Sequence, residues 1–306
     1  MSSDAALRDH EASTPDRQTA LKEFLRSRRA RIKPEDVGLQ SSGHRRVPGL
    51  RREELAQLAG VSFAYYAQLE QGYSDGVSTS VLDSVARALK LTEDERSHFL
   101  RLAQPERPTA PPATAQQLRP EIQNLLDALG VPAFVTGRCM DILGWNRLAA
   151  TIFGDLGDLP PEERNWPLLM FFSSTTRERF VDLERREQNT VRILRTHHGL
   201  YPGDPRLACL VTELSRKSER FRQLWVRHDV GCGNTGPLRM RHPLVGEFDL
   251  KTELLMLPND PDQRLQTYHA EPGSASEKAL RVLAEWSDPS GGPAVDGPRD
   301  LGQPQT

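Results

Sequence analysis

The chain has 306 residues, of which 37% are hydrophobic, and this length is sufficient for two domains that each bury a core of their own. No apolar run approaches the roughly 20 residues of a membrane-spanning helix, and the spacing of Cys139, Cys209 and Cys232 argues against a disulfide framework or a structural zinc site. The formal net charge of −2 does not exclude a nucleic-acid partner, because binding depends on where positive charge is concentrated.

Composition divides the chain into five segments. Residues 1–18 and 287–306 lack apolar periodicity, and the second segment combines four prolines with four glycines, so we expect both to be disordered. The first residues resemble neither a signal peptide nor a transit peptide, and we therefore expect a cytoplasmic protein. The proline-rich segment 104–119 predicts a linker between a domain at 19–103 and a second domain at 120–286.

The first domain has helical periodicity throughout, which predicts an all-α fold. Its first helix has one apolar face and one basic face, and between residues 20 and 60 ten basic residues stand against five acidic ones. Thr92 and Glu95 form a capping box before the last helix, and 81–89 predicts another short helix. The apolar face comprises Leu21, Phe24, Leu25, Arg28 and Ile32, and the basic face comprises Lys22, Arg26, Arg29 and Lys33.

Segment 51–72 predicts two helices joined by a three-residue turn. Gly60 suits the positive φ of such a turn, Val61 fills the angle between the helices, and Ser62 caps the second helix. Tyr66 and Leu69 are expected to face inward with Leu55 and Leu58. An ordinary helical hairpin can share this spacing, but the serine cap, the basic first helix and the proline-rich exit favour a DNA-binding helix-turn-helix.

In a helix-turn-helix, the exposed start of the second helix enters the major groove. Gln68 is the natural hydrogen-bonding reader of bases, Phe63 and Ala64 suit a thymine methyl group, and Tyr65, which also points away from the core, suits either the bases or the phosphate backbone. Arg51 and Arg52 begin the first motif helix, where phosphate would pass. The full set of candidate DNA-binding residues is Arg45, Arg46, Arg51, Arg52, Ser62, Phe63, Ala64, Tyr65 and Gln68.

The second domain alternates short strands and helices. Strands are expected on both sides of the turn at Thr136 and Gly137, and the strongest helix is expected to run from an Asp204 cap through Trp225. Further strands are expected at 238–244, 245–250, 254–257 and 265–270, followed by a helix at 276–286. This order predicts an α+β domain built on an antiparallel sheet.

The first domain resembles the Xre family of lambda-repressor-like regulators, whose head has five helices. The resemblance is carried by residues 50–72, LRREELAQLAGVSFAYYAQLEQG. The long basic extension before it, together with 140–146, 224–230, 241–250 and 268–283, resembles the MmyB-like regulators, whose second domain is PAS-like. The resemblance implies a transcription regulator whose second domain binds a small apolar ligand such as a fatty acid, with no cofactor. We also expect a homodimer that reads two half-sites in double-stranded DNA.

A surplus of large apolar residues, including Trp166, is compatible with a ligand pocket enclosed by the sheet and its helices. For any single residue the hydrophobic core is the simpler explanation. A second domain that serves only dimerisation or protein contacts is therefore the alternative reading. The candidate ligand-binding residues are Phe134, Leu143, Trp145, Phe153, Leu169, Met170, Phe171 and Phe172.

Catalytic and metal sites are not expected. The GCGNTG segment at 231–236 matches a dinucleotide fingerprint, but a helix precedes it and a strand follows, which is the reverse of the required order. Adjacent His197 and His198 point about 100° apart on a helix and cannot easily share one ion. We expect His228 and Asp229, with Arg227, to tie the long helix to the sheet, and an enzyme tethered to DNA is the least favoured hypothesis.

Overall fold

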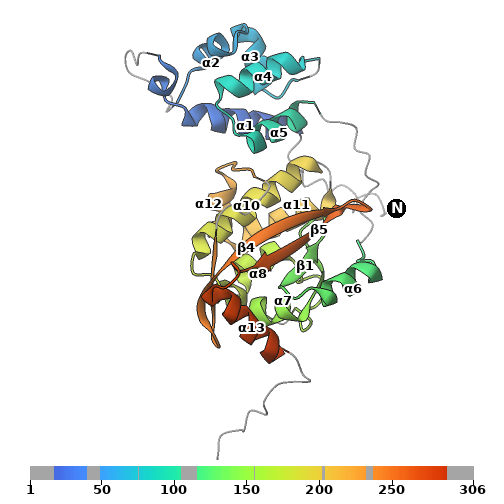
Figure 1. Cartoon of the computed structure of the whole chain (residues 1–306). Coiled ribbons are helices and arrows are strands. Elements are labelled where there is room, and N and C mark those ends of the chain that lie inside the picture. The colour runs from blue at the N-terminus through green and yellow to red at the C-terminus, as the bar shows by residue number, and fades with distance from the viewer. Residues whose placement is uncertain are drawn as a thin grey trace, which may run out of the picture.

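The computed structural model describes residues 17–39, 49–74, 76–104, 116–154, 156–201, 204–231 and 237–287. They form a helical head, drawn at the top of Figure 1, and a larger α+β domain below it. None of the helices among these residues combines the length and the apolar composition needed to cross a membrane.

The head is all-α, as its periodicity predicts. Its described part contains five α-helices, and the side chains at its centre, including Leu21, Phe24, Tyr66 and Phe99, have 1% exposure or less. The elements are α1 (Arg17–Arg31), a 3-10 turn (Pro34–Val37), α2 (Arg52–Ala59), α3 (Phe63–Glu70), α4 (Thr79–Ala88) and α5 (Glu93–Ala103).

Local capping chemistry fixes where the head helices begin. The predicted box at α5 is confirmed, because the Glu95 amide donates to Thr92 Oγ1 at 3.3 Å and the Thr92 amide donates to the Glu95 carboxylate at 2.9 Å. The predicted basic outer face of α1 is wrong at one position. Arg29 is only 9% exposed and turns inward toward an acidic partner on α3.

The second domain is built on a five-stranded antiparallel sheet in the order β2-β1-β5-β4-β3. The strands are β1 (Ala133–Thr136), β2 (Ile142–Trp145), β3 (Leu238–His242), β4 (Gly246–Leu257) and β5 (Asp260–His269). The helices are α6 (Pro120–Ala128), α7 (Arg147–Phe153), α8 (Trp166–Phe172), α9 (Ser174–Glu178), α10 (Leu183–Leu200), α11 (Pro205–Lys217), α12 (Glu219–Trp225) and α13 (Ala275–Ser287).

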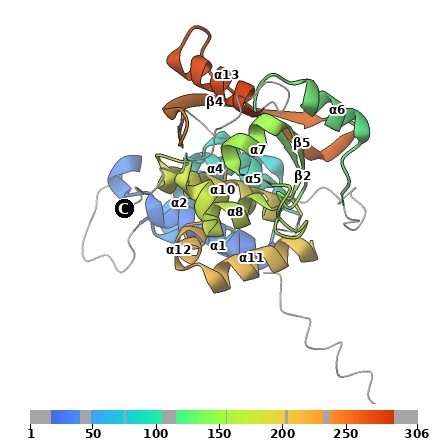
Figure 2. The ribbon, with the colours of Figure 1, turned by 90° about the horizontal axis from the view of Figure 1, so that it is seen from below.

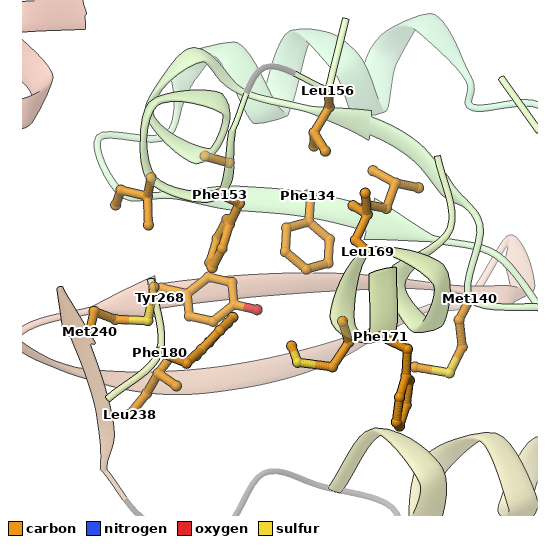
Figure 3. Close-up of a cluster of buried hydrophobic side chains, with 14 of the residues drawn as sticks. Phe134, Met140, Phe153, Leu156, Leu169, Phe171, Phe180, Leu238, Met240 and Tyr268 are labelled. Carbon is orange, nitrogen blue, oxygen red and sulfur yellow. The ribbon is translucent and has the colours of Figure 1, made fainter. Parts of the chain in front are cut away.

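Helices cover both faces of the sheet at β1, whose four residues are all buried. Ala133 and Val135 pack with α6 on one face, and Phe134 packs with α7, α8 and α10 on the other. Figure 2 shows α6 on the opposite side of β5 from α8 and α10. On the α8 and α10 side, rings from several elements meet, with Phe134 5.8 Å from Phe153 and 5.7 Å from Tyr268 between centroids (Figure 3).

Three predicted boundaries are wrong, the first being the start of β5, which lies at Asp260 rather than at residue 265. The helix expected from Asp204 to Trp225 is two helices, because the chain breaks at Ser218, whose hydroxyl caps α12 by accepting from the Phe221 amide at 3.1 Å. The separate strands expected at 245–250 and 254–257 are one strand, β4. Its ladder with β5 runs through residues 251–257, so the polar residues between the two apolar runs do not interrupt it.

The head rests on the second domain through α1 and α5, which face α10 and α12 (Figure 1). Helices α2 and α3 lie on the far side of the head. The helix-turn-helix therefore faces away from the second domain in this arrangement.

Candidate functional site

The turn between α2 and α3 has the backbone that a helix-turn-helix needs. Gly60 adopts a left-handed conformation with φ of 68°. Its amide and the Val61 amide both donate to the Ala56 carbonyl and so end α2. Ser62 then caps α3 by accepting from the Tyr65 amide at 3.1 Å. The predicted roles of Gly60 and Ser62 in the turn are confirmed.

Helix α3 presents one face to solvent and one to the core. Tyr66 and Leu69 have no exposed surface, whereas Phe63 is 50% exposed, a large value for an aromatic ring. Leu58 of α2, expected inside, is instead 38% exposed. Of the other candidates on α3 and its cap, Ser62, Ala64 and Gln68 are exposed and Tyr65 is half-buried.

A buried carboxylate fixes α3 to the rest of the head. Glu70 is 1% exposed and accepts two hydrogen bonds from Arg29, at 2.7 and 3.0 Å, one from Arg52 at 2.8 Å and one from the Tyr66 hydroxyl at 2.9 Å. Burial alone would raise the pKa of Glu70, but the bonds from Arg29 and Arg52 hold that pKa below its ordinary value. Helix α3 is thus anchored by an ionised side chain, Glu70, which no local sequence pattern indicates.

The two candidate phosphate contacts at the start of α2 differ in their surroundings. Arg51 is exposed, and its amide donates to the Glu54 carboxylate at 2.7 Å. The Arg52 side chain is 45% exposed and forms an ion pair with Glu70. Arg45 and Arg46 lie outside the described residues.

The structure places most of the predicted ligand-binding residues in the core. Phe134, Phe153, Leu169 and Met170 are 5% exposed or less, and Phe171, at 7%, packs with them. The remaining three lie elsewhere: Trp145 at the edge of this core, Leu143 on the α6 face, and Phe172 with 43% exposure.

A cavity of about 240 Å³ lies beside this core, between the sheet and α10. Trp166 connects the two, because its ring stacks on Phe134 at 5.3 Å while also lining the cavity. Met140, Trp166, Ile193 and Leu254 supply apolar wall, and Thr136, His197, Thr252, Glu253, Arg264 and Gln266 supply the polar part. The prediction from the sequence did not include these polar residues. The alternation of side chains along β5 could have indicated them, because it puts Arg264, Gln266 and Tyr268 on one face of the sheet.

The polar part of the cavity is organised around a neutral histidine. His197 Nδ1 lies 2.7 Å from the Arg138 carbonyl oxygen, so Nδ1 carries the proton and Nε2 accepts from the Arg264 guanidinium. Burial, reinforced by Arg264, lowers the pKa of His197 to about 4, which keeps it uncharged at neutral pH. Among the described residues, the buried Thr252 hydroxyl has no hydrogen-bond partner. A ligand with an oxygen acceptor and an apolar body fits this lining.

The groups considered as catalytic or metal sites have other positions. His197 faces the cavity whereas His198 lines the space between the domains, and the described residues contain no cluster of His, Cys, Asp or Glu suited to a metal ion. His228 and Asp229 do not tie a helix to the sheet as expected, because they contact α1 of the head. Cys232, and the glycine-rich segment from 232 to 236, lie outside the described residues.

Comparison with known families divides the chain in the same way. Residues 20–99 match a family model described as a helix-turn-helix domain. Residues 118–283, more than half of the chain, match the model of the MmyB-like transcription regulator ligand binding domain. A search of curated proteins found no match.

Proposed function

The chain belongs to the MmyB-like transcription regulators, and we propose that it reads specific DNA bases through α3 and is gated by a small carboxylic acid with an apolar tail. DNA binding through a helix-turn-helix, with a ligand-binding domain behind it, is the function of this architecture. The base-reading residues, the ligand and the oligomeric state are the parts proposed here. One observation carries the DNA-reading proposal: α3 exposes Phe63, Ala64 and Gln68 while Glu70 holds its other face in the core.

Gln68 and Phe63 are proposed as base readers. A glutamine amide can donate and accept at the same time, which matches the adenine edge in the major groove, and the exposed Phe63 ring suits a thymine methyl group. Ser62, Ala64 and Tyr65 complete the surface that meets the groove. Arg51 and Arg52, with Arg45 and Arg46 before them in sequence, are proposed to contact phosphate.

The test begins with a binding site selected from random duplexes by the purified full-length protein. Gln68→Ala should reduce discrimination between the selected base and its alternatives by about 1–3 kcal/mol and leave nonspecific affinity unchanged. Arg51→Ala should weaken specific and nonspecific binding alike and reduce the salt slope by about 0.9. Arg51 is the cleaner variant, because Arg52→Ala also removes a hydrogen bond to Glu70.

Gln223→Ala, an exposed glutamine on α12, is the matched control and should bind as the unmodified protein does. If Gln68→Ala keeps full base preference, α3 does not read bases through this residue. An unchanged salt slope for Arg51→Ala would remove Arg51 from the phosphate contacts.

The ligand proposal rests on the lining of the cavity beside α10. Arg264 offers a planar cation that suits a carboxylate, and Met140, Trp166 and Ile193 offer an apolar surface for a tail. A volume of about 240 Å³ lies below the usual range of about 300–1,000 Å³ for ligand pockets, which favours a medium-length tail. The predicted residues Phe134, Phe153 and Leu169 would then support this wall from behind.

Calorimetry with decanoate and decanol tests the ligand class. The unmodified protein should bind decanoate at least about tenfold more tightly than decanol, because a charge-assisted pair to Arg264 adds about 1.5–3 kcal/mol. Arg264→Met should abolish that preference and retain decanol binding. Equal binding of both compounds by the unmodified protein would show that the cavity does not select a carboxylate.

The alternative is a second domain that makes only protein contacts. Mass spectrometry of gently purified protein separates the two proposals, since a stoichiometric apolar acid supports gating and its consistent absence supports a contact module. A homodimer is part of either proposal, because one head buries limited surface on DNA. Sedimentation with DNA should give two chains per pair of half-sites spaced by one helical turn, and one chain per site would refute the dimer.

A further inference from the structure

A short segment between α12 and β3 joins the two domains. We call residues 227–231 the clasp. On the head side, Asp229 lies 2.8 Å from the Arg31 guanidinium, Arg28 donates to the His228 carbonyl, and Val230, 3% exposed, packs into the head core. The clasp belongs to the second domain by sequence, but its Val230 side chain is buried in the core of the first.

Helix α10 holds the clasp from the other side. Arg195 Nη1 lies 3.1 Å from His228 Nδ1, and its guanidinium stacks on the Trp225 ring at 3.8 Å. The Gly231 amide donates to Thr196 Oγ1 at 3.1 Å, and Arg192 donates to the Val230 carbonyl at 3.2 Å. Movement of α10 therefore moves the clasp.

The head also contacts α10 directly at Gly199. A Cβ atom at Gly199 would lie 2.4 Å from the imidazole of His98 on α5, closer than real Cβ contacts allow. His98 is 4% exposed, so its ring has little room to move aside. His98 and Gly199 are therefore in direct contact, beside a cavity of only about 20 Å³ that both residues line.

The opposite face of α10 forms a wall of the cavity. Ile193 and His197 line the cavity, whereas His198 and Gly199 line the space between the domains. Successive helical residues turn by about 100°, which is why the neighbours His197 and His198 face different partners. One helix is thus in contact with both the cavity and the head.

We propose that α10 couples the cavity to the head, so that an acid bound to Arg264 loosens the docking of the head on α10 and on the clasp. The inference rests on the proposed ligand. Arg264 now donates to His197 and so fixes the last turn of α10 to β5. A carboxylate is a stronger acceptor for a guanidinium than a neutral imidazole, and it competes for this donor.

Loss of the Arg264 bond removes one contact between the last turn of α10 and β5, and leaves the Tyr201 hydroxyl donating to Asp262 on that strand. Because Gly199 and His98 are already in contact, a small displacement of this turn is enough to disturb docking of the head. Coupling of two sites is reciprocal, so weaker docking must also strengthen binding of the acid. The proposal therefore makes two predictions that are measured independently.

The test uses the full-length protein and decanoate. Gly199→Ala should increase amide hydrogen exchange in α5 and the clasp by at least about tenfold and should bind decanoate at least about fivefold more tightly. Gly130→Ala is the matched control, since a Cβ there meets no atom within 4 Å, and both quantities should stay as in the unmodified protein. Asp229→Asn weakens the ion pair between the clasp and Arg31 of the head, so it should change both quantities in the same direction as Gly199→Ala. It replaces Gly199→Ala in the test if that variant folds poorly.

Each outcome has a separate meaning. Faster exchange together with tighter binding supports the coupling. Faster exchange with unchanged affinity for decanoate overturns it, and unchanged exchange in both Gly199→Ala and Asp229→Asn shows that these contacts do not dock the head. If the unmodified protein does not bind decanoate, the proposed ligand class fails, a result distinct from binding without coupling.

Discussion

Replacing Glu70 by glutamine should loosen the packing of α3 against the head. The substitution keeps the size of the side chain but removes the charge that Arg29 and Arg52 share. Arg29 is 9% exposed, so it would remain buried without its counter-ion. Breaking a buried ion pair from one side typically costs about 3–5 kcal/mol, and the lower end applies here because glutamine can still accept a hydrogen bond.

Hydrogen exchange of the α3 amides measures this loss. A decrease of about 3 kcal/mol in the free energy of opening accelerates exchange roughly 100-fold. Glu93→Gln is the control, because the Glu93 side chain is 81% exposed and its pair with Arg96 at 3.4 Å is at the surface. It should change exchange of α3 by less than about twofold. If Glu70→Gln and Glu93→Gln gave the same exchange, the reasoning about the buried carboxylate would be refuted.

The same carboxylate gives the head a pH dependence of known sign. Because the pKa of Glu70 in the folded protein lies below the ordinary value of 4.5, the unfolded chain takes up a proton first as the pH falls. Its contribution to stability is complete above about pH 4.5 and is lost as the pH falls toward the folded-state pKa. Unfolding of the head in urea should become easier over this window, and Glu70→Gln should remove that part of the slope.

Five further substitutions test the folds of the two domains. Ser62→Ala removes the α3 cap and should destabilise the helix by about 1 kcal/mol, seen as roughly fivefold faster exchange in α3 and unchanged exchange in α5. Gly60→Ala should lower the free energy of unfolding by about 1 kcal/mol, because alanine is strained at this positive φ. Gly72→Ala should lower it further, because its Cβ would also lie 2.5 Å from the Gln18 carbonyl oxygen. Equal unfolding temperatures for the two variants would contradict this reasoning. Phe134→Ala should lower the stability of the second domain by about 3–5 kcal/mol, whereas the half-exposed Phe172→Ala should lower it by less than about 1 kcal/mol. Tryptophan fluorescence in urea reports this difference, because all four tryptophans lie in the second domain.

The sequence by itself determined the local structure of the head. Caps and turns act over three or four residues, so Gly60, Ser62 and the box of Thr92 and Glu95 could be read directly, and apolar periodicity identified the buried face of α3. The same short range explains the correct α+β class of the second domain. The predicted boundaries in the second domain were wrong where the local pattern was ambiguous. Ser218 is an example, because a serine fits either the interior of a helix or its cap.

Only the tertiary structure decided which residues meet across long separations. Arg29 and Glu70 are 41 residues apart, and Arg28 and His228 are 200 apart, so no periodicity predicts either contact. For the same reason the large apolar residues chosen from the sequence lie mostly in the core, while the cavity takes its cation from β5 and its wall from α10. Hydrophobicity reports that a side chain is buried, but the packing of helices against the sheet decides which of the buried surfaces encloses a space.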